Sequence, residues 1–206
     1  MAEDIKLTKM ELRSQQVKLA QLQKYLPTLQ LKKAMLQVEV NTAQHEINQL
    51  KGEFKSAEER VLKFSRLLSD KSAPDLFSAI KIHKVGKKYE NIAGIDVPYF
   101  EGISFEAPSY ALFDTPLWME SAVLWIHDLL TLREKIKIGY EKKTALEKEL
   151  REVSIRVNLF EKIMIPRALG NIKKIKIFLG DQQLAAVSQA KIAKRKILMK
   201  MDKEAT

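Results

Sequence analysis

The sequence predicts a mainly α fold in which two long helices form an antiparallel coiled coil, with a small β-rich head inserted between them. Three observations support this prediction. Apolar residues recur at steps of three and four in the N-terminal third, the same steps recur in the C-terminal half, and the segment between them is rich in proline, glycine and aromatic residues. We therefore divide the 206-residue chain into an N-terminal helix (1–71), a head (72–115) and a C-terminal helix with a basic tip (116–206).

The first helix is predicted from a narrow apolar stripe that runs from Leu12 to Leu68. Alternating steps of three and four from Leu12 meet seventeen positions, and only Gln15 and Lys33 among them are not apolar. A stripe kept so narrow for about eight heptads is typical of a coiled coil rather than of a globular helix.

Two local signals refine this first helix. Thr8 and Glu11 have the spacing of a capping box, so we expect the helix to begin there. Pro27 lies well inside the stripe, where we expect a bend rather than an end.

The head is predicted from a change in composition. Residues 72–115 hold three of the six prolines and three of the seven glycines, and 78–85 alternate apolar and polar residues as a half-buried strand does. Residues 90–106 are interpreted as two further short strands, with turns near Gly94 and Gly102. The aromatic residues of the head have two interpretations, either as its core or as a docking face for a partner; the candidates for docking are Tyr99, Phe100 and Phe105.

The second helix is predicted from a stripe over 118–164, in which only Gly139 and Lys143 are weak. After Pro166 the apolar positions continue at Ala168, Ile172, Ile175 and Leu179, which is a shifted register. Such a shift changes the local supercoil, so Pro166 is predicted to lie where a kink is least disruptive.

The second helix is longer than the first by some twenty residues, so its last ~30 Å is expected to project alone or to dock in a partner. Its basic residues there are Lys191, Lys194, Arg195 and Lys196. They are interpreted either as favourable charges at a helix C-terminus or as contacts to an acidic surface, and a phosphate backbone would also suit them.

The net charge of +10, with a sequence pI near 9.6, favours an acidic partner: nucleic acid, an anionic membrane surface or an acidic protein. The alternative is that these charges are spread over solvated helix surfaces. The N-terminus has no signal-peptide pattern, and we expect a soluble protein inside the cell.

No site for catalysis is predicted. The sequence lacks cysteine, and its histidines (His45, His83 and His127) are far apart, so each is expected to be an ordinary surface or interface residue. There is neither a glycine-rich phosphate loop nor an uncharged apolar run of ~20 residues. We therefore expect no catalytic residue, no cofactor or metal site, and no membrane insertion.

Three segments carry a resemblance to a known family. "RVNLFEKIMIPRALGNIKKIKIFL" (156–179) resembles the C-terminal signature of the D subunit of the V-type and A-type rotary ATPases. "ENIAGIDVPYFE" (90–101) looks like that family's head segment, and "VKLAQLQKYLPTLQLKKAML" (17–36) is a looser match to its first helix. The most specific residues of the resemblance are Arg156, Val157, Asn158, Ile165, Pro166 and Arg167.

The resemblance implies a non-catalytic rotor component in the central stalk of a proton- or sodium-translocating ATPase. It implies that the coil enters the hexamer of A and B subunits and turns with ATP hydrolysis or synthesis. The other implied partners are the small F subunit of the stalk and the funnel-like subunit (C or d) on the membrane ring. The implied location is the cytoplasmic face of the membrane, in a peripheral sector. Two alternatives stay open, a nucleic-acid-binding coiled coil, which no recognised motif supports, and a self-associating scaffold.

Overall fold

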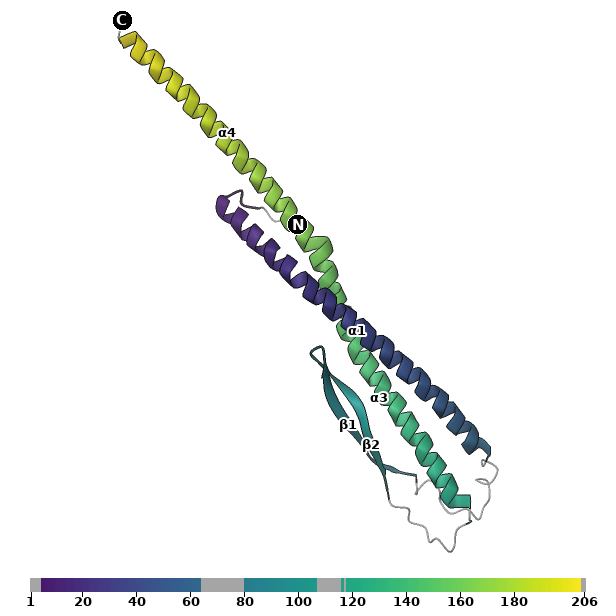
Figure 1. Ribbon diagram of the computed structural model, residues 1–206. Coiled ribbons are helices and arrows are strands. Elements are labelled where there is room, and N and C mark those ends of the chain that lie inside the picture. Colours follow the sequence, from purple (N-terminus) through teal and green to yellow (C-terminus); the bar gives the residue numbers. More distant parts are fainter. Residues whose placement is uncertain (1–4, 64–79, 107–115, 117, 205–206) are drawn as a thin grey trace. The chain divides into compact units, whose positions relative to one another are not determined.

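The computed structural model of the chain describes residues 5–63, 80–106, 116 and 118–204, with side chains up to residue 200. Its elements are, in order, helix α1 (Lys9–Lys63), strands β1 (Ile82–Ile92) and β2 (Ile95–Phe105), helix α3 (Trp118–Leu159), the π-helical turn η2 (Phe160–Met164) and helix α4 (Ile165–Glu204) (Figure 1). This order confirms the predicted fold class, with long helices on either side of a small antiparallel sheet.

The chain divides into two compact units, and α1 contributes to both. The hairpin unit comprises Lys32–Val153, and the tip unit comprises Met1–Leu31 together with Ser154–Thr206. Each unit has its own packing, which is described separately below.

Helix α1 begins where the sequence predicts. The backbone N–H of Glu11 donates to Thr8 Oγ1 over 3.2 Å, which caps the first turn. In a capping box the Glu11 carboxylate would also accept a hydrogen bond from the backbone N–H of Thr8. Here Glu11 Oε1 instead accepts from the Gln15 side chain at 2.9 Å. The helix continues through Pro27 without ending. Since Pro27 is exposed, water can reach the carbonyl group that the proline leaves without a backbone donor.

The predicted apolar stripes are the buried faces of the helices. Every position of the first stripe from Leu12 to Val61 is buried or half-buried, and so is every position of the second from Trp118 to Leu179. The last two positions of the first stripe, Phe64 and Leu68, lie outside the described residues. The fully buried members include Leu36, Ile47, Leu146 and Ile175.

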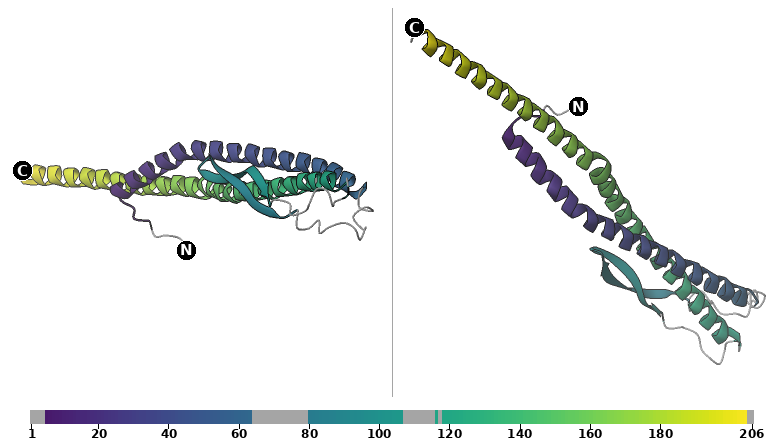
Figure 2. Two further views of the ribbon diagram at one scale, coloured as in Figure 1. Left: turned by 90° about the horizontal axis from the view of Figure 1, so that it is seen from below. Right: turned by 45° about the horizontal axis from the view of Figure 1, so that its top comes forward.

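In the hairpin unit, α1 and α3 run antiparallel and side by side (Figure 2). Lys32 pairs with Glu149 at 2.8 Å, whereas Glu46, further along α1, pairs with Lys142, which is earlier in α3. Near the same level, a Cβ atom built on Gly139 would lie 3.1 Å from Ile47 Cγ1. The weak stripe position at Gly139 therefore allows the two helices to approach closely, which a larger side chain would prevent.

The head contains two long strands rather than the three short ones predicted. β1 and β2 form one antiparallel hairpin, closed by Ala93 and Gly94 with φ values of 52° and 85°. Positive φ at both positions is the geometry of a type I′ turn, which matches the twist of paired strands. The turn predicted near Gly102 is wrong: Gly102 lies inside the ladder opposite Gly86, beside a register shift that absorbs the irregularity.

The hairpin covers a second face of α3 that the stripe did not predict. Val97 of β2 is 0% exposed, and Ile138 and Lys142 of α3, outside the stripe, are also buried. The hairpin and the two helices line a pocket of about 240 Å³ that is partly open to solvent and is lined in part by Ile47, Pro98 and Ile138. The helix pair therefore supplies the support that an isolated two-stranded hairpin lacks.

In the tip unit, the predicted change of register occurs at the π-helical turn just before Pro166. The N–H of Ile165 donates to the carbonyl of Phe160, five residues back, so the turn holds one extra residue. Regular steps from Met164 would next meet Arg167, whereas the residue that is buried is Ala168, at 3% exposure. The extra residue thus keeps Arg167 at the surface and the apolar stripe inside.

Candidate functional site

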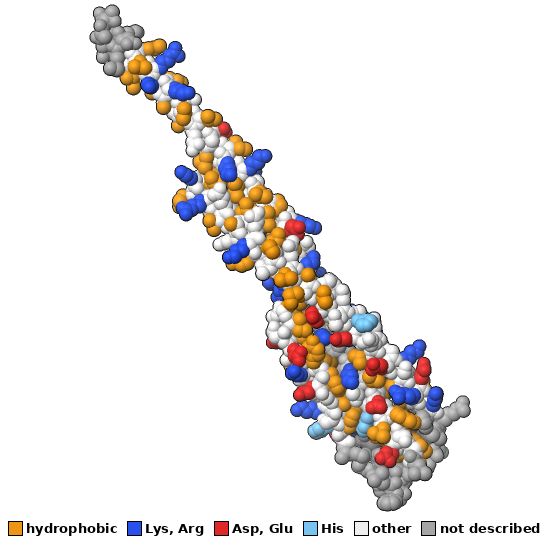
Figure 3. Space-filling view, in the orientation of Figure 1, with side chains coloured by type: hydrophobic (Ala, Val, Ile, Leu, Met, Phe, Trp, Pro, Cys, Tyr) orange, Lys and Arg blue, Asp and Glu red, His pale blue; other side chains and the backbone are white. Residues whose placement is uncertain are grey.

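The end of α4 has no cover in the tip unit. Residues 181–200 are all exposed, although six of them are large and apolar. Figure 3 shows hydrophobic side chains among Lys and Arg along the described part of this helix. The exposed apolar residues are Leu184, Val187, Ile192, Ile197, Leu198 and Met199. Helical stability in proteins comes mainly from packing of an apolar face, and the described chain does not cover the apolar side chains of this stretch.

The charge of the same stretch is one-sided. The predicted basic residues Lys191, Lys194, Arg195 and Lys196 are all exposed, and Lys200 joins them. The only acidic residue from 181 to 200 is Asp181, at the far end of the stretch. A surface that is both apolar and basic is complementary to a concave apolar surface that carries acidic side chains.

The six residues that carry the family resemblance divide between the buried seam and the surface. Val157 is buried at 3% exposure and Ile165 is half-buried, so both belong to the seam. The other four flank the π-helical turn and are exposed: Arg156, Asn158, Pro166 and Arg167. Packing in the seam accounts for Val157 and Ile165.

The three aromatic residues predicted as a docking face each contact α3. The ring of Phe105 stacks on His127 with centroids 3.8 Å apart and an interplanar angle of 7°. Lys135 Nζ lies 5.5 Å from the ring centroid of Phe100, and Lys142 Nζ lies 4.3 Å from that of Tyr99. These contacts favour the interpretation of the rings as packing groups of the head.

Lys142 joins three elements at this point. It lies on α3, contacts the Tyr99 ring on β2, and donates to Glu46 Oε2 on α1 at 3.1 Å. Burial lowers the pKa of the Lys142 ammonium, but its interactions with Tyr99 and Glu46 outweigh that effect, and the pKa lies above its ordinary value. Lys142 therefore stays charged at neutral pH although its side chain is only 5% exposed.

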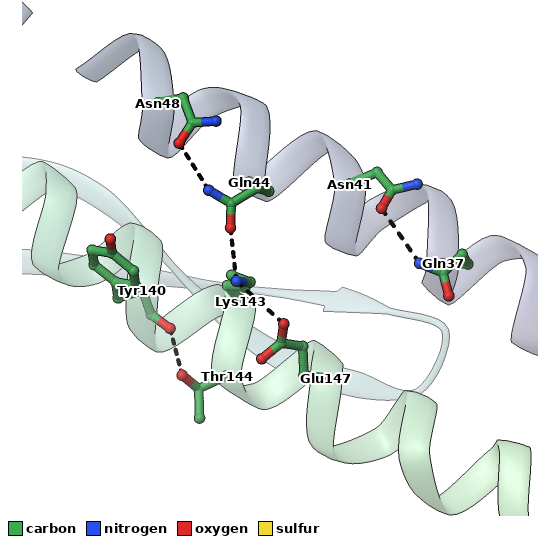
Figure 4. A network of polar contacts seen from close by, with 8 residues as sticks. All are labelled: Gln37, Asn41, Gln44, Asn48, Tyr140, Lys143, Thr144 and Glu147. Carbon is green, nitrogen blue, oxygen red and sulfur yellow. Dashed lines mark hydrogen bonds and ion pairs between the residues drawn. The ribbon is translucent and has the colours of Figure 1, made fainter. Parts of the chain in front are cut away.

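A polar network fixes the position of the two helices along one another (Figure 4). Lys143 Nζ donates to Gln44 Oε1 at 2.7 Å and pairs with Glu147 at 3.3 Å, and Gln44 in turn donates to Asn48. Lys143 is the second weak position of the predicted stripe. Its polar contacts specify one alignment of the seam, which a purely apolar position would leave less restricted.

Two kinds of feature are absent from the described residues. No group of three or more His, Asp or Glu side chains within them is arranged to hold a metal ion. None of the helices in that part of the chain is long and apolar enough to cross a membrane. The surface grooves of the described residues include one of about 840 Å³ along α3, beside Ile136, Tyr140 and Ala145.

Comparison with known proteins agrees with the architecture. The family described as the ATP synthase D subunit matches residues 11–195 of the chain. The V-type ATP synthase D subunit of Chlamydia caviae is 44% identical over 198 residues, which cover 96% of this chain and 95% of that protein. Proteins of the same name from Chlamydia abortus and Chlamydia pneumoniae are 42% and 39% identical, each over 96% of this chain and 95% of its own length. The chain therefore belongs to the family of ATP synthase D subunits.

Proposed function

We propose that this chain is the non-catalytic rotor shaft in the central stalk of a V- or A-type ATPase, and that it transmits torque between the catalytic hexamer and an ion-translocating membrane ring. The observation that carries the proposal is the uncovered end of α4. Twenty consecutive helical residues are exposed, they carry six large apolar side chains, and their charge is basic. Such a helix needs a surrounding partner, and membership of the D-subunit family supports the hexamer as that partner.

The proposed assembly follows the implications of the family resemblance. The end of α4 lies inside the hexamer of A and B subunits, with Lys191, Lys194, Arg195 and Lys196 against acidic groups of the surrounding subunits. The F subunit and the funnel-like subunit on the membrane ring bind elsewhere along the shaft. The chain then works in a peripheral sector on the cytoplasmic face of the membrane.

The packing suits a part that carries load. A shaft has to resist sliding of one helix along the other, and the Lys32–Glu149 and Lys143–Gln44 contacts oppose such sliding. The close approach at Gly139 and Ile47 adds a steric lock. A shaft without internal symmetry also presents a different face to each catalytic site, which can favour a different state in each.

The first test is assembly with the purified hexamer, with and without the F subunit, at near-physiological salt and with excess competitor DNA. We expect one shaft per hexamer, resistant to DNA, and loss of binding when residues 190–206 are deleted. A full-length variant with the four basic tip residues changed to glutamine is the matched control, because it keeps the apolar side chains. We expect this variant to bind more weakly than the wild type and with less dependence on salt.

The second test measures rotation. Because the sequence has no cysteine, one cysteine placed at exposed Lys84 on β1 gives a unique attachment point for a bead. ATP-driven rotation of the bead on an immobilised hexamer would support the proposal. Binding without rotation would reduce the chain to a static component, and capture by the DNA instead of the hexamer would favour the nucleic-acid alternative.

A further inference from the structure

The β1–β2 hairpin lies along α3 with little apolar burial of its own (Figure 1). β1 has no buried residue, and β2 has only two, Val97 and Pro98. Pro98 lines the partly open pocket of about 240 Å³ together with Ile47 and Ile138 of the helices. The free energy needed to separate two surfaces grows with the apolar area that they bury, so a small and incompletely filled interface opens at low cost.

Three of the contacts that join the hairpin to α3 involve charged groups. The rings of Tyr99 and Phe100 on β2 face two lysine ammonium groups of α3, as described above. In addition, Lys87 Nζ on β1 donates to Glu141 Oε2 on α3 over 2.5 Å. The side chains of Lys87 and Glu141 are 31% and 41% exposed, so water and salt reach this pair. Attraction between partly exposed charges weakens as the ionic strength rises.

The seam between α1 and α3 has its own sources of stability. Leu36 and Leu146, which belong to the two apolar stripes, are both 0% exposed. If the hairpin leaves, Lys142 keeps Glu46 of α1 as its ion-pair partner, and its ammonium group gains access to water. Departure of the hairpin therefore leaves no buried charge unpaired, which would otherwise oppose it.

We infer that the hairpin is a detachable strap, which leaves α3 while α1 and α3 stay packed, and that its charged contacts to α3 set how often it does so. Proteins open in such local units where a part of the structure has few buried apolar contacts. In the open state the face of α3 that carries Ile138 and Lys142 meets solvent, and salt shifts the equilibrium toward that state. This device goes beyond the proposed function, because it is a property of the chain without any partner.

Two single-cysteine variants of the full chain report the two kinds of opening. Val97 on β2 is 0% exposed, Val153 in the helix seam is 1% exposed, and the sequence has no cysteine of its own. Val97→Cys and Val153→Cys therefore make the same change at equally buried positions, one in the hairpin and one in the seam. The measurement is the rate of maleimide labelling, divided by the rate for the same variant in urea to remove differences in intrinsic thiol reactivity.

The hairpin cysteine should be the more reactive of the two. We expect the normalised rate at position 97 to exceed that at 153 by about tenfold or more. It should rise about threefold between ~0.05 and ~0.5 M NaCl, while the rate at 153 stays the same.

A second pair of variants tests the charged contacts, in the Val97→Cys background. Lys87→Gln should raise the labelling rate about two- to fivefold, as loss of a partly exposed ion pair does. Lys88→Gln is the matched control, because Lys88 pairs with Glu90 on the same strand and not with α3. It should change the rate by less than about 1.5-fold.

Amide exchange of the wild-type chain supplies the same comparison without a substitution. An isolated hairpin is marginally stable, so β1 and β2 lose protection once they leave the helices, and salt should speed their exchange more than that of the seam. Equal normalised rates at 97 and 153, without a salt response, would show that the hairpin opens only when the whole unit unfolds, and would overturn the inference. Equal effects of Lys87→Gln and Lys88→Gln would refute the role of the charged contacts. Neither result bears on binding to the hexamer, which tests the proposed function separately.

Discussion

Replacement of Pro166 by alanine tests what holds the π-helical turn in place. Pro166 has no backbone N–H, and in a regular α-helix its ring would meet the carbonyl of Lys162, four residues back. The alanine variant removes both restrictions, so the helix is then free to become α-helical throughout. Our expectation is that the π-helical turn nevertheless persists, because the residues that follow Pro166 require it.

The magnitudes favour persistence. An α-helical turn would gain one backbone hydrogen bond, worth about 1 kcal/mol. It would also move the seam from Ala168, Ile172, Ile175 and Leu179 to Arg167, Asn171, Lys174 and Phe178. Ile172 and Ile175 are 8% and 0% exposed, and burial of two such side chains contributes roughly 3–6 kcal/mol. The variant should therefore keep its register and change the free energy of unfolding by no more than about 1 kcal/mol.

Crosslinking measures the register directly. Leu12 and Leu179 line the same groove in the tip unit, and the sequence contains no cysteine that would interfere. Cysteines at 12 and 179 should react together with a short bismaleimide, with or without Pro166→Ala. Cysteines at 12 and 178 serve as the control pair, since Phe178 is the residue that an α-helical turn would bring to the seam.

The refuting result is a transfer of the crosslink. If Pro166→Ala moves the reaction from the 12–179 pair to the 12–178 pair, then the proline imposes the π-helical turn and the seam does not. Urea unfolding supplies a second check, because a register change would expose the two isoleucines and alter stability by several kcal/mol.

Further predictions concern the hairpin unit. Gly139→Leu should force α1 and α3 apart at Ile47 and destabilise the protein by about 1–3 kcal/mol, measured by urea unfolding. Gly139→Ala should be nearly neutral, because the higher helix propensity of alanine offsets the tight contact with Ile47. Ala93→Asn should raise the melting temperature. Asparagine tolerates the positive φ of this turn, whereas for alanine this backbone conformation costs about 1 kcal/mol of free energy. Lys142→Ala should destabilise the protein by about 2–3 kcal/mol and speed amide exchange in β1 and β2. Tyr99→Phe, which keeps the ring but removes the hydroxyl group that helps to hold the Lys142 charge, should have a smaller effect. The pKa of Lys142 is raised on folding. Its contribution to the free energy of unfolding should therefore be constant below the unfolded pKa of about 10.4 and should decline as pH rises through the higher folded value. Wild type and Lys142→Met should converge in stability only at strongly alkaline pH.

The apolar periodicity of the sequence was sufficient to predict the long helices and their buried faces. From Leu12 to Val61 and from Trp118 to Leu179, each described position of the two stripes is buried or half-buried. The register change near Pro166 was also visible, since the apolar steps shift there. These features are local because helical geometry alone decides which residues share a face.

The form of that register change was not predictable. A shift of one residue is compatible with a kink, a break or a π-helical turn, and the hydrogen bond from Ile165 to Phe160 distinguishes among them. The exposure of Arg167 and Pro166 follows from that bond, so it became visible only in the structure. The exposed end of α4, in contrast, could be expected from the unequal lengths of the two helices.

What the sequence by itself determined is the helical framework: two seams, a cap at Thr8, a turn at Gly94 and a basic, uncovered end. Only the tertiary structure decided how the hairpin is held. Ile138 and Lys142 lie outside the α3 stripe and are nevertheless buried, and they line one pocket with Pro98 of β2. A second buried face on a helix arises when another element packs against it, and that contact joins residues distant in sequence. Periodicity within one helix cannot report such a contact, because it records only which side is apolar and not what covers the rest.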